Sequence, residues 1–183
     1  TNKKIELNLK SVKFLLDPYN FTVNIITKEP TVLLDSKELK IKEIKTNISL
    51  KLLIFNEFSL EDLQISTKVI KLEDLILLVR SFKNSTELFI LDRVIKSGSF
   101  TADIKLEFDE KGNIKKNYQI RGLIKNVKLK FLNKVKVRNL GFKFDIQKNK
   151  YTLMKIKGDI DLIKLSAPLI EINQKKDQFL ITG

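Results

Sequence analysis

Hydrophobic and polar residues alternate along most of this chain. In residues 100–108 one set of alternate positions is wholly apolar, and the positions between them are polar or charged. The apolar set is Phe100, Ala102, Ile104, Leu106 and Phe108. A side-chain period of two is typical of a β-strand with one buried face and one solvated face. The alternation therefore predicts a β-rich chain whose strands present a shared apolar face.

Residues 1–71 predict an antiparallel β meander. Short alternating segments are separated by turn signals such as residues 17–20, where Asp, Pro and Asn favour a tight turn. The alternation within residues 4–14 slips once in phase, which predicts a bulge or a bend. The apolar positions from Leu39 to Leu52 predict a strand segment with a small break near Glu43.

The period changes from two to that of a helix at Leu72. Apolar residues at helical spacing predict one helix, with acidic residues in its first turn and basic residues in its last. Ser85 is a candidate N-cap for a second helix, and Gly98 is expected to end that helix in a left-handed conformation. Residues 72–97 therefore predict a helical hairpin between two β regions. The first helix is expected to show an apolar stripe of Leu72, Leu75, Ile76, Val79 and Phe82.

Residues 98–183 predict a series of antiparallel strands. A Lys125–Asn126 turn is expected between the second and third of them. The segments 120–129 and 156–165 align at an offset of 36 residues, with Gly122 matching Gly158. The alignment indicates a repeat of a few strands, or a chance likeness between lysine-rich amphipathic strands. The expected strands cover residues 99–108, 117–124, 127–132, 139–147, 150–157, 159–165, 168–173 and 178–182.

These elements predict a mainly β fold with a short helical hairpin, in which residues 1–183 form a single domain. Two helices of about 10 Å diameter cover only about four strands at a spacing of about 4.8 Å. The remaining apolar face is expected to pack on itself as a partly closed barrel or sandwich, or to curve strongly into a groove that holds an apolar occupant.

Composition excludes several kinds of chemistry. The chain contains no cysteine and no histidine, which excludes Ser-His-Asp and Cys-His catalysis and histidine- or cysteine-based metal sites. Paired carboxylates such as Asp103 and Glu107, or Asp159 and Asp161, alternate with lysines as solvated residues do. We therefore expect a protein that is not an enzyme and that uses no cofactor or metal.

The net charge of +13 comes mainly from lysine. Proteins that recognise nucleic-acid sequence favour clustered arginine, whereas this chain has four arginines, which are scattered. The charge is consistent with solvated strand faces or with attraction to an anionic lipid surface, and we expect no nucleic-acid partner. The chain begins at Thr1 and contains no run of about 18 apolar residues, so we expect a fragment of a longer chain without a membrane-spanning helix of its own.

Two parts of the sequence resemble the AsmA-like family of bacterial envelope proteins, the group that includes YhdP and TamB. Residues 98–112, followed by residues 118–122, show a strand, an Asp-x-x-Gly turn at Asp109 and Gly112, and a strand with an internal glycine. The helical segment at residues 71–80, which follows residues 60–65, is also similar to the layout of that family.

The resemblance implies a function in phospholipid transport between membranes. Members combine an N-terminal inner-membrane helix with a periplasmic β-rich body, whose open apolar groove carries acyl chains toward the outer membrane. This chain lacks such a helix, so the resemblance implies a periplasmic piece anchored by a segment outside it. Its partner would be a phospholipid or another lipid with acyl chains, with rim lysines meeting the phosphate head groups.

Nine apolar residues are candidates for the groove lining, although each would serve equally well in an ordinary packed core. A different possibility is a structural or assembly module whose strand edges pair with another envelope protein. The candidate lining residues are Phe100, Ile104, Leu106, Phe108, Ile120, Ile124, Phe142, Phe144 and Ile146.

Overall fold

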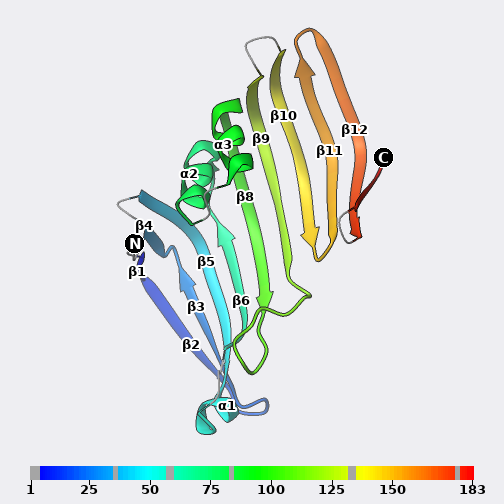
Figure 1. Ribbon diagram of the computed structural model, residues 1–183. Coiled ribbons are helices and arrows are strands. Elements are labelled where there is room, and N and C mark those ends of the chain that lie inside the picture. Colours follow the sequence, from blue (N-terminus) through cyan, green and yellow to red (C-terminus); the bar gives the residue numbers. More distant parts are fainter. Residues whose placement is uncertain (1–4, 35–36, 57–59, 83–84, 132–134, 176–177) are drawn as a thin grey trace. The chain divides into compact units, whose positions relative to one another are not determined.

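The computed structural model describes residues 5–34, 37–56, 60–82, 85–131, 135–175 and 178–183 (Figure 1). In these residues, thirteen antiparallel strands belong to one sheet, and the sheet is not closed into a barrel. The mainly β, antiparallel architecture predicted from the alternation is confirmed. The chain divides into two compact units. The first contains residues 1–68 and 102–120, and the second contains residues 69–101 and 121–183.

The first unit is organised around the long strand β5. This strand pairs with β4 near its start, with β3 over its second half, and with β6. The phase slip expected in residues 4–14 separates β1, which pairs with β4, from β2, which pairs with β3. The elements of this unit are β1 (Ile5–Asn8), β2 (Ser11–Asp17), β3 (Thr22–Lys28), β4 (Thr31–Leu34), β5 (Lys37–Ser49), α1 (Leu50–Ile54) and β6 (Leu60–Thr67).

The small break expected near Glu43 corresponds to a shift of register between Ile41 and Glu43, through which β5 continues. One prediction for this unit is wrong. Leu50 and Leu52 belong to the short helix α1 rather than to a strand. The buried Ser49 accepts a hydrogen bond from the Leu52 backbone N–H (3.5 Å), as a residue that caps the start of a helix does.

The second unit combines a helical hairpin with a run of antiparallel strands that are neighbours both in sequence and in the sheet. Strand β8 contributes residues 95–101 to this unit and its remaining residues to the first. The elements are β7 (Ile70–Lys71), α2 (Leu72–Phe82), α3 (Thr86–Val94), β8 (Ile95–Glu107), β9 (Gln119–Phe131), β10 (Val135–Gln147), β11 (Lys150–Ile160), β12 (Ile163–Lys175) and β13 (Gln178–Thr182).

The two helices occur where the helical spacing predicts them. Ser85 caps α3, because its hydroxyl accepts a hydrogen bond from the Leu88 backbone N–H (3.4 Å). The prediction that Gly98 ends this helix is wrong, because α3 ends at Val94 and Gly98 lies inside β8. A glycine suits this position because its φ of 156° is one that L side chains rarely adopt, and because a Cβ here would lie 2.6 Å from Cδ1 of Leu72 and 3.3 Å from Cα of Val127.

The expected turn at Lys125–Asn126 is instead a bulge inside one continuous strand, β9. Asn126 has a left-handed backbone (φ 54°), and Asn139 in β10 and Lys155 in β11 have the same conformation. An extra residue of this kind shifts the alternation by one position. Ile124 and Val127 are three positions apart yet line the same cavity. The two strands expected at 117–124 and 127–132 are therefore one, and β10 and β11 likewise begin or end outside their expected limits.

Candidate functional site

The second unit contains an apolar cavity of about 440 Å³ between the helical hairpin and strands β9 and β10. Every residue that lines it is hydrophobic. The helices contribute Leu75, Ile76, Val79, Leu88, Leu91 and Val94, among others. The strands contribute Ile124, Val127, Leu129, Phe131, Leu140 and Phe142.

The two periodicities of the sequence bring these side chains together. In α2, residues three or four positions apart lie on one face of the helix, which places Leu75, Ile76 and Val79 toward the sheet. In β9 and β10, alternate residues face the helices, and the bulges at Asn126 and Asn139 keep the apolar positions in phase. A helical stripe and an alternating strand face thus meet across the cavity.

Helix α3 covers the cavity without closing it. None of its residues is buried, although four of its side chains line the cavity. The side chains of Ile90 and Leu91 are 52% and 44% exposed. Apolar side chains that line a cavity and also remain open to water form an entrance that an apolar ligand can fill.

The side chain of Arg80 connects the two helices beside this cavity. Arg80 of α2 forms an ion pair with Asp92 of α3. The guanidinium groups of Arg80 and Arg93 lie 5.6 Å and 4.5 Å from the centre of the Phe89 ring, within the range of cation–π attraction. The two contacts of Arg80 hold α3 to α2 although no residue of α3 is buried, whereas the contact of Arg93 with Phe89 lies within α3.

The structure brings two of the nine predicted lining residues into this cavity, Ile124 and Phe142. Phe100 and Phe144 lie in the same unit but stack on each other, with ring centroids 5.7 Å apart, and Phe144 is buried. Ile146 follows Phe144 in β10 and does not line the cavity.

The other four predicted residues, which are Ile104, Leu106, Phe108 and Ile120, belong to the first unit. The helical side of the cavity was not predicted as a binding surface, because the apolar stripe of α2 is equally typical of a helix that only covers a core. The sequence signal for it is the presence of two amphipathic helices beside a larger apolar sheet face.

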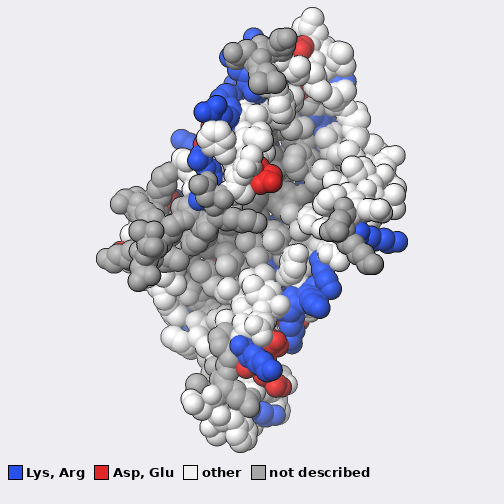
Figure 2. Space-filling model, viewed as in Figure 1, with Lys and Arg blue, Asp and Glu red and all other residues white. Residues whose placement is uncertain are grey.

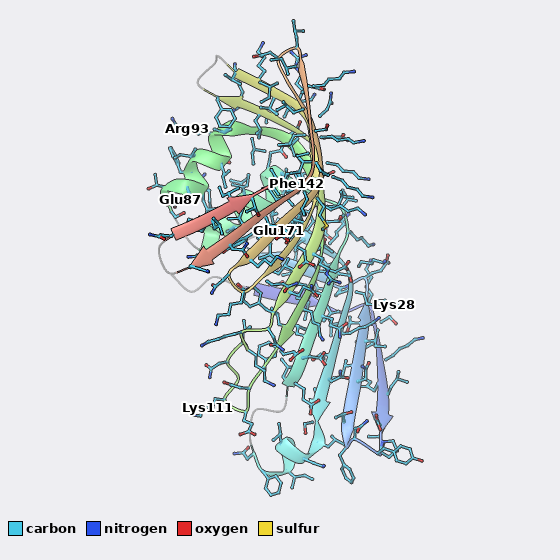
Figure 3. All side chains as sticks on the ribbon, turned by 90° about the vertical axis from the view of Figure 1, so that its right-hand side faces the viewer. Lys28, Glu87, Arg93, Lys111, Phe142 and Glu171 are labelled. Atoms are coloured by element: carbon cyan, nitrogen blue, oxygen red, sulfur yellow. The ribbon has the colours of Figure 1, made fainter. Side chains whose placement is uncertain are left out.

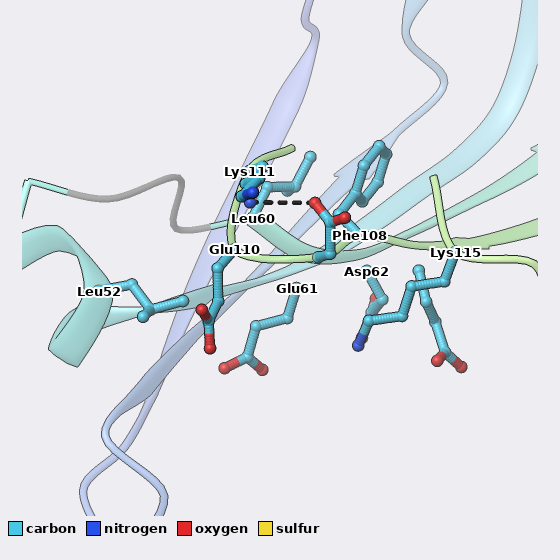
Figure 4. A pocket seen from close by; sticks show the side chains of 10 residues that line it. Leu52, Leu60, Glu61, Asp62, Phe108, Glu110, Lys111 and Lys115 are labelled. Carbon is cyan, nitrogen blue, oxygen red and sulfur yellow. Dashed lines mark hydrogen bonds between the residues drawn. The ribbon is translucent and has the colours of Figure 1, made fainter. Parts of the chain in front are cut away.

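Phe108 lines a different, charged pocket of about 660 Å³ in the first unit (Figure 4). This pocket lies beside the predicted turn at residues 109–113, which the structure confirms. One carboxylate oxygen of Asp109 accepts hydrogen bonds from the backbone N–H groups of Lys111 (3.0 Å) and Asn113 (2.8 Å). The pKa of Asp109 is lowered by the backbone and side-chain hydrogen bonds from Asn113. Acidic and basic side chains both line the pocket, including Glu61, Glu110 and Lys115.

The paired carboxylates of the strands have ordinary structural partners. Asp103 accepts a hydrogen bond from Ser66 (2.6 Å), and Asp159 accepts one from Asn139 (2.7 Å). Hydrogen bonds from Asn117 and Lys105 lower the pKa of Glu107, which is opposite to the shift that a general acid needs. Among the described residues, no group of three or more acidic side chains is arranged to hold a metal ion.

On the face drawn in Figure 2, uncharged residues cover most of the described surface, with lysine and arginine side chains visible among them. No helix in the described part of the chain is long and apolar enough to cross a membrane.

Comparisons with protein-family models, with curated proteins and with solved structures find no match to this chain.

Proposed function

We propose that this protein is a non-enzymatic lipid-handling module that holds an acyl chain in the apolar cavity of its second unit. The observation that carries the proposal is the cavity itself, whose lining is wholly hydrophobic and partly open to water. Catalytic and polar-ligand sites place a few polar groups among apolar ones to orient the ligand. A lining without polar groups suits a ligand that is itself a hydrocarbon.

The size of the cavity suits a hydrocarbon chain. Its volume of about 440 Å³ lies in the usual range of small-molecule sites, which is roughly 300–1,000 Å³. Each buried methylene contributes about 0.8 kcal/mol, so ten of them contribute about 8 kcal/mol before the cost of association is subtracted. Since the lining includes no charged side chain, the head group would lie outside the cavity. We therefore expect affinities in the micromolar range or weaker.

We further propose that the chain is an AsmA-like module of a bacterial envelope protein. In this role it guides phospholipid acyl chains from the inner toward the outer membrane, and it lies in the periplasm, held by an inner-membrane helix in another segment. The meander of β9 to β13, in which each strand pairs with the next, supports this proposal because such a sheet is extended by adding further strands.

A second candidate function is a structural module in envelope assembly that pairs with a partner strand. Strand β13 pairs only with residues 171–175 of β12. In the described part of the chain, residues 163–170 of β12 therefore have a neighbouring strand, β11, on one side only. Unpaired strand edges are sites at which other strands can add. Crosslinking from Lys164 to a partner protein, with no lipid bound, would favour this function.

Titration with cis-parinaric acid, a fatty acid that fluoresces in apolar surroundings, tests the lipid-handling proposal. The variant Leu91→Gln places an amide in the cavity lining at a side chain that is already 44% exposed, so the fold should tolerate it. An acyl chain in the cavity would cover this amide. Burial of an uncompensated amide costs about 1–3 kcal/mol, which predicts binding of the acyl chain weakened by on the order of tenfold or more. Leu77→Gln is the matched control, because Leu77 is 38% exposed on α2 and does not line the cavity. Equal binding by all three proteins, or no binding by the unmodified chain, would contradict the proposal.

A further inference from the structure

The sheet of the second unit carries a basic face opposite its helices. Residues paired directly across antiparallel strands point to the same side of the sheet. Arg138 of β10 pairs with Asp159 of β11, and Asp159 pairs with Lys164 of β12, so these three side chains share one face. Phe144 pairs with Leu153 on the other face, the side on which Phe142 and its neighbours meet the helices.

The same alternation places further exposed lysines on this basic face. Lys128 in β9 is exposed and lies next to Val127, which lines the cavity on the opposite face. Lys143 in β10 and Lys157 in β11 are also exposed, and each lies next to an apolar residue of the helix side. In Figure 3, α3 with Glu87 and Arg93 lies on one side of the upper strands, and long side chains ending in nitrogen project from the other side.

Most of the net charge of the chain is concentrated in these strands. Residues 121–183 contain 15 lysines or arginines and 5 aspartates or glutamates, a net charge of +10 out of +13 for the whole chain. Only part of this charge is neutralised locally. Arg121 pairs with Asp145 and Lys150 pairs with Glu171, each at 2.8 Å. Among the described residues, Lys128, Lys143 and Lys157 form no ion pair with an acidic side chain.

We propose that this basic face, formed by the exposed lysines and arginines of β9 to β12, binds the surface of an anionic phospholipid bilayer. A pleated sheet displays its side chains on a grid, with about 6.7 Å between alternate residues along a strand and about 4.8 Å between strands. Such a grid meets many head groups of a planar bilayer at once. Each lysine near an anionic bilayer contributes to binding through its charge, without a fixed geometry.

The composition of this face favours a bilayer over a nucleic acid. Proteins that bind single strands stack the bases on aromatic side chains. The phenylalanines of β10, which are Phe142 and Phe144, lie on the opposite face. The apolar residues on the basic face are aliphatic, such as Met154, which pairs with Lys143, and Leu169, which pairs with Met154. This inference concerns the opposite face from the acyl-chain cavity and does not depend on that cavity binding a lipid.

Flotation with vesicles tests the proposal. Vesicles of phosphatidylcholine mixed with phosphatidylglycerol are compared with vesicles of phosphatidylcholine alone. The unmodified chain should float only with the anionic vesicles, and raised salt should release it. The triple variant K128Q/K143Q/K157Q should bind roughly fivefold more weakly per lysine removed, or on the order of 100-fold in total. The control variant K13Q/K42Q/K116Q removes the same charge from exposed lysines of the first unit and should change binding much less.

Circular dichroism should show that both triple variants remain folded. If K128Q/K143Q/K157Q does not fold, its three single variants are tested in its place. Failure to float with anionic vesicles would overturn the proposal, as would equal losses in the two triple variants. Displacement from the vesicles by single-stranded DNA, with DNA binding lost in K128Q/K143Q/K157Q, would assign the face to nucleic acid instead. Loss of vesicle binding in Leu91→Gln, with the lysine variants unaffected, would assign membrane binding to the cavity.

Discussion

The ring of Phe144 packs directly over Gly122 of the neighbouring strand. A Cβ at Gly122 would lie 2.4 Å from Cζ of this ring and 2.2 Å from the carbonyl oxygen of Thr101, which is closer than non-bonded atoms can approach. Phe144 is buried and also stacks on Phe100. The absence of a side chain at Gly122 therefore makes room for the aromatic pair that packs β8, β9 and β10 together.

Gly122→Ala should destabilise the protein by about 1–3 kcal/mol, because the added methyl group forces Phe144 or the backbone to move. Gly158→Ala is the natural comparison, since this glycine occupies the matching place in the predicted repeat. Its Cβ would lie no closer than 3.3 Å to Leu140, so we expect a smaller loss. Urea unfolding of both variants measures which of them loses more free energy of unfolding. A larger loss in Gly158→Ala would show that the packing around Phe144 is not as tight as described.

Asn126→Val should destabilise the protein by about 1–2 kcal/mol relative to Asn126→Gly. Asn126 has φ of 54°, a left-handed conformation that asparagine and glycine adopt readily and that a β-branched residue does not. Asn126 is exposed, so the effect should come from the backbone rather than from lost packing. Urea unfolding measures the difference. Equal stability of the two variants would indicate that the bulge rearranges and that β9 tolerates a shift in phase.

The turn at Asp109 should lose stability in acid. Hydrogen bonds from Asn113 lower the pKa of Asp109 in the folded protein below its usual value of about 3.9. A lowered carboxyl pKa contributes stability above the usual pKa, and this contribution is lost as the pH falls through the folded-state value. NMR titration of the Asp109 carboxyl carbon measures this pKa directly.

Asn113→Ala provides the control for that titration. The variant removes the side-chain amide and keeps the backbone N–H, so the pKa of Asp109 should rise part of the way to its usual value. If Asp109 titrates at or above about 3.9 in the unmodified chain, these hydrogen bonds do not hold the turn as described.

Local periodicity was sufficient to predict the helices and the strand-rich character of the chain. The spacing of Leu72, Leu75 and Ile76 places all three side chains on one face of a helix. The hydroxyl of Ser85 accepts a hydrogen bond from Leu88, only three residues further along the chain. Such features depend on residues near one another in the sequence. The same is true of the turn at Asp109, whose hydrogen bonds all come from the four residues that follow it.

Features that depend on distant parts of the chain were not predictable in this way. Asparagine with a left-handed backbone occurs both in turns and in bulges, so the sequence around Asn126 is compatible with either. Only the structure shows that β9 continues past Asn126. A glycine is typical of a helix end, but Gly98 lies inside β8, where its φ of 156° and its closeness to Leu72 and Val127 favour a residue without a side chain. The cavity requires the stripe of α2 to meet β9 and β10, which explains why only Ile124 and Phe142 of the nine candidates line it.

Mass spectrometry of organic extracts tests most directly the claim that the apolar cavity holds an acyl chain. The protein is purified without detergent from bacterial cells and extracted, and the lipid is counted per protein molecule. We expect a fatty acid or phospholipid in near-stoichiometric amounts with the unmodified chain and with Leu77→Gln, and a clear depletion with Leu91→Gln. Recovery of no lipid above that from an unrelated protein purified in the same way would contradict the account.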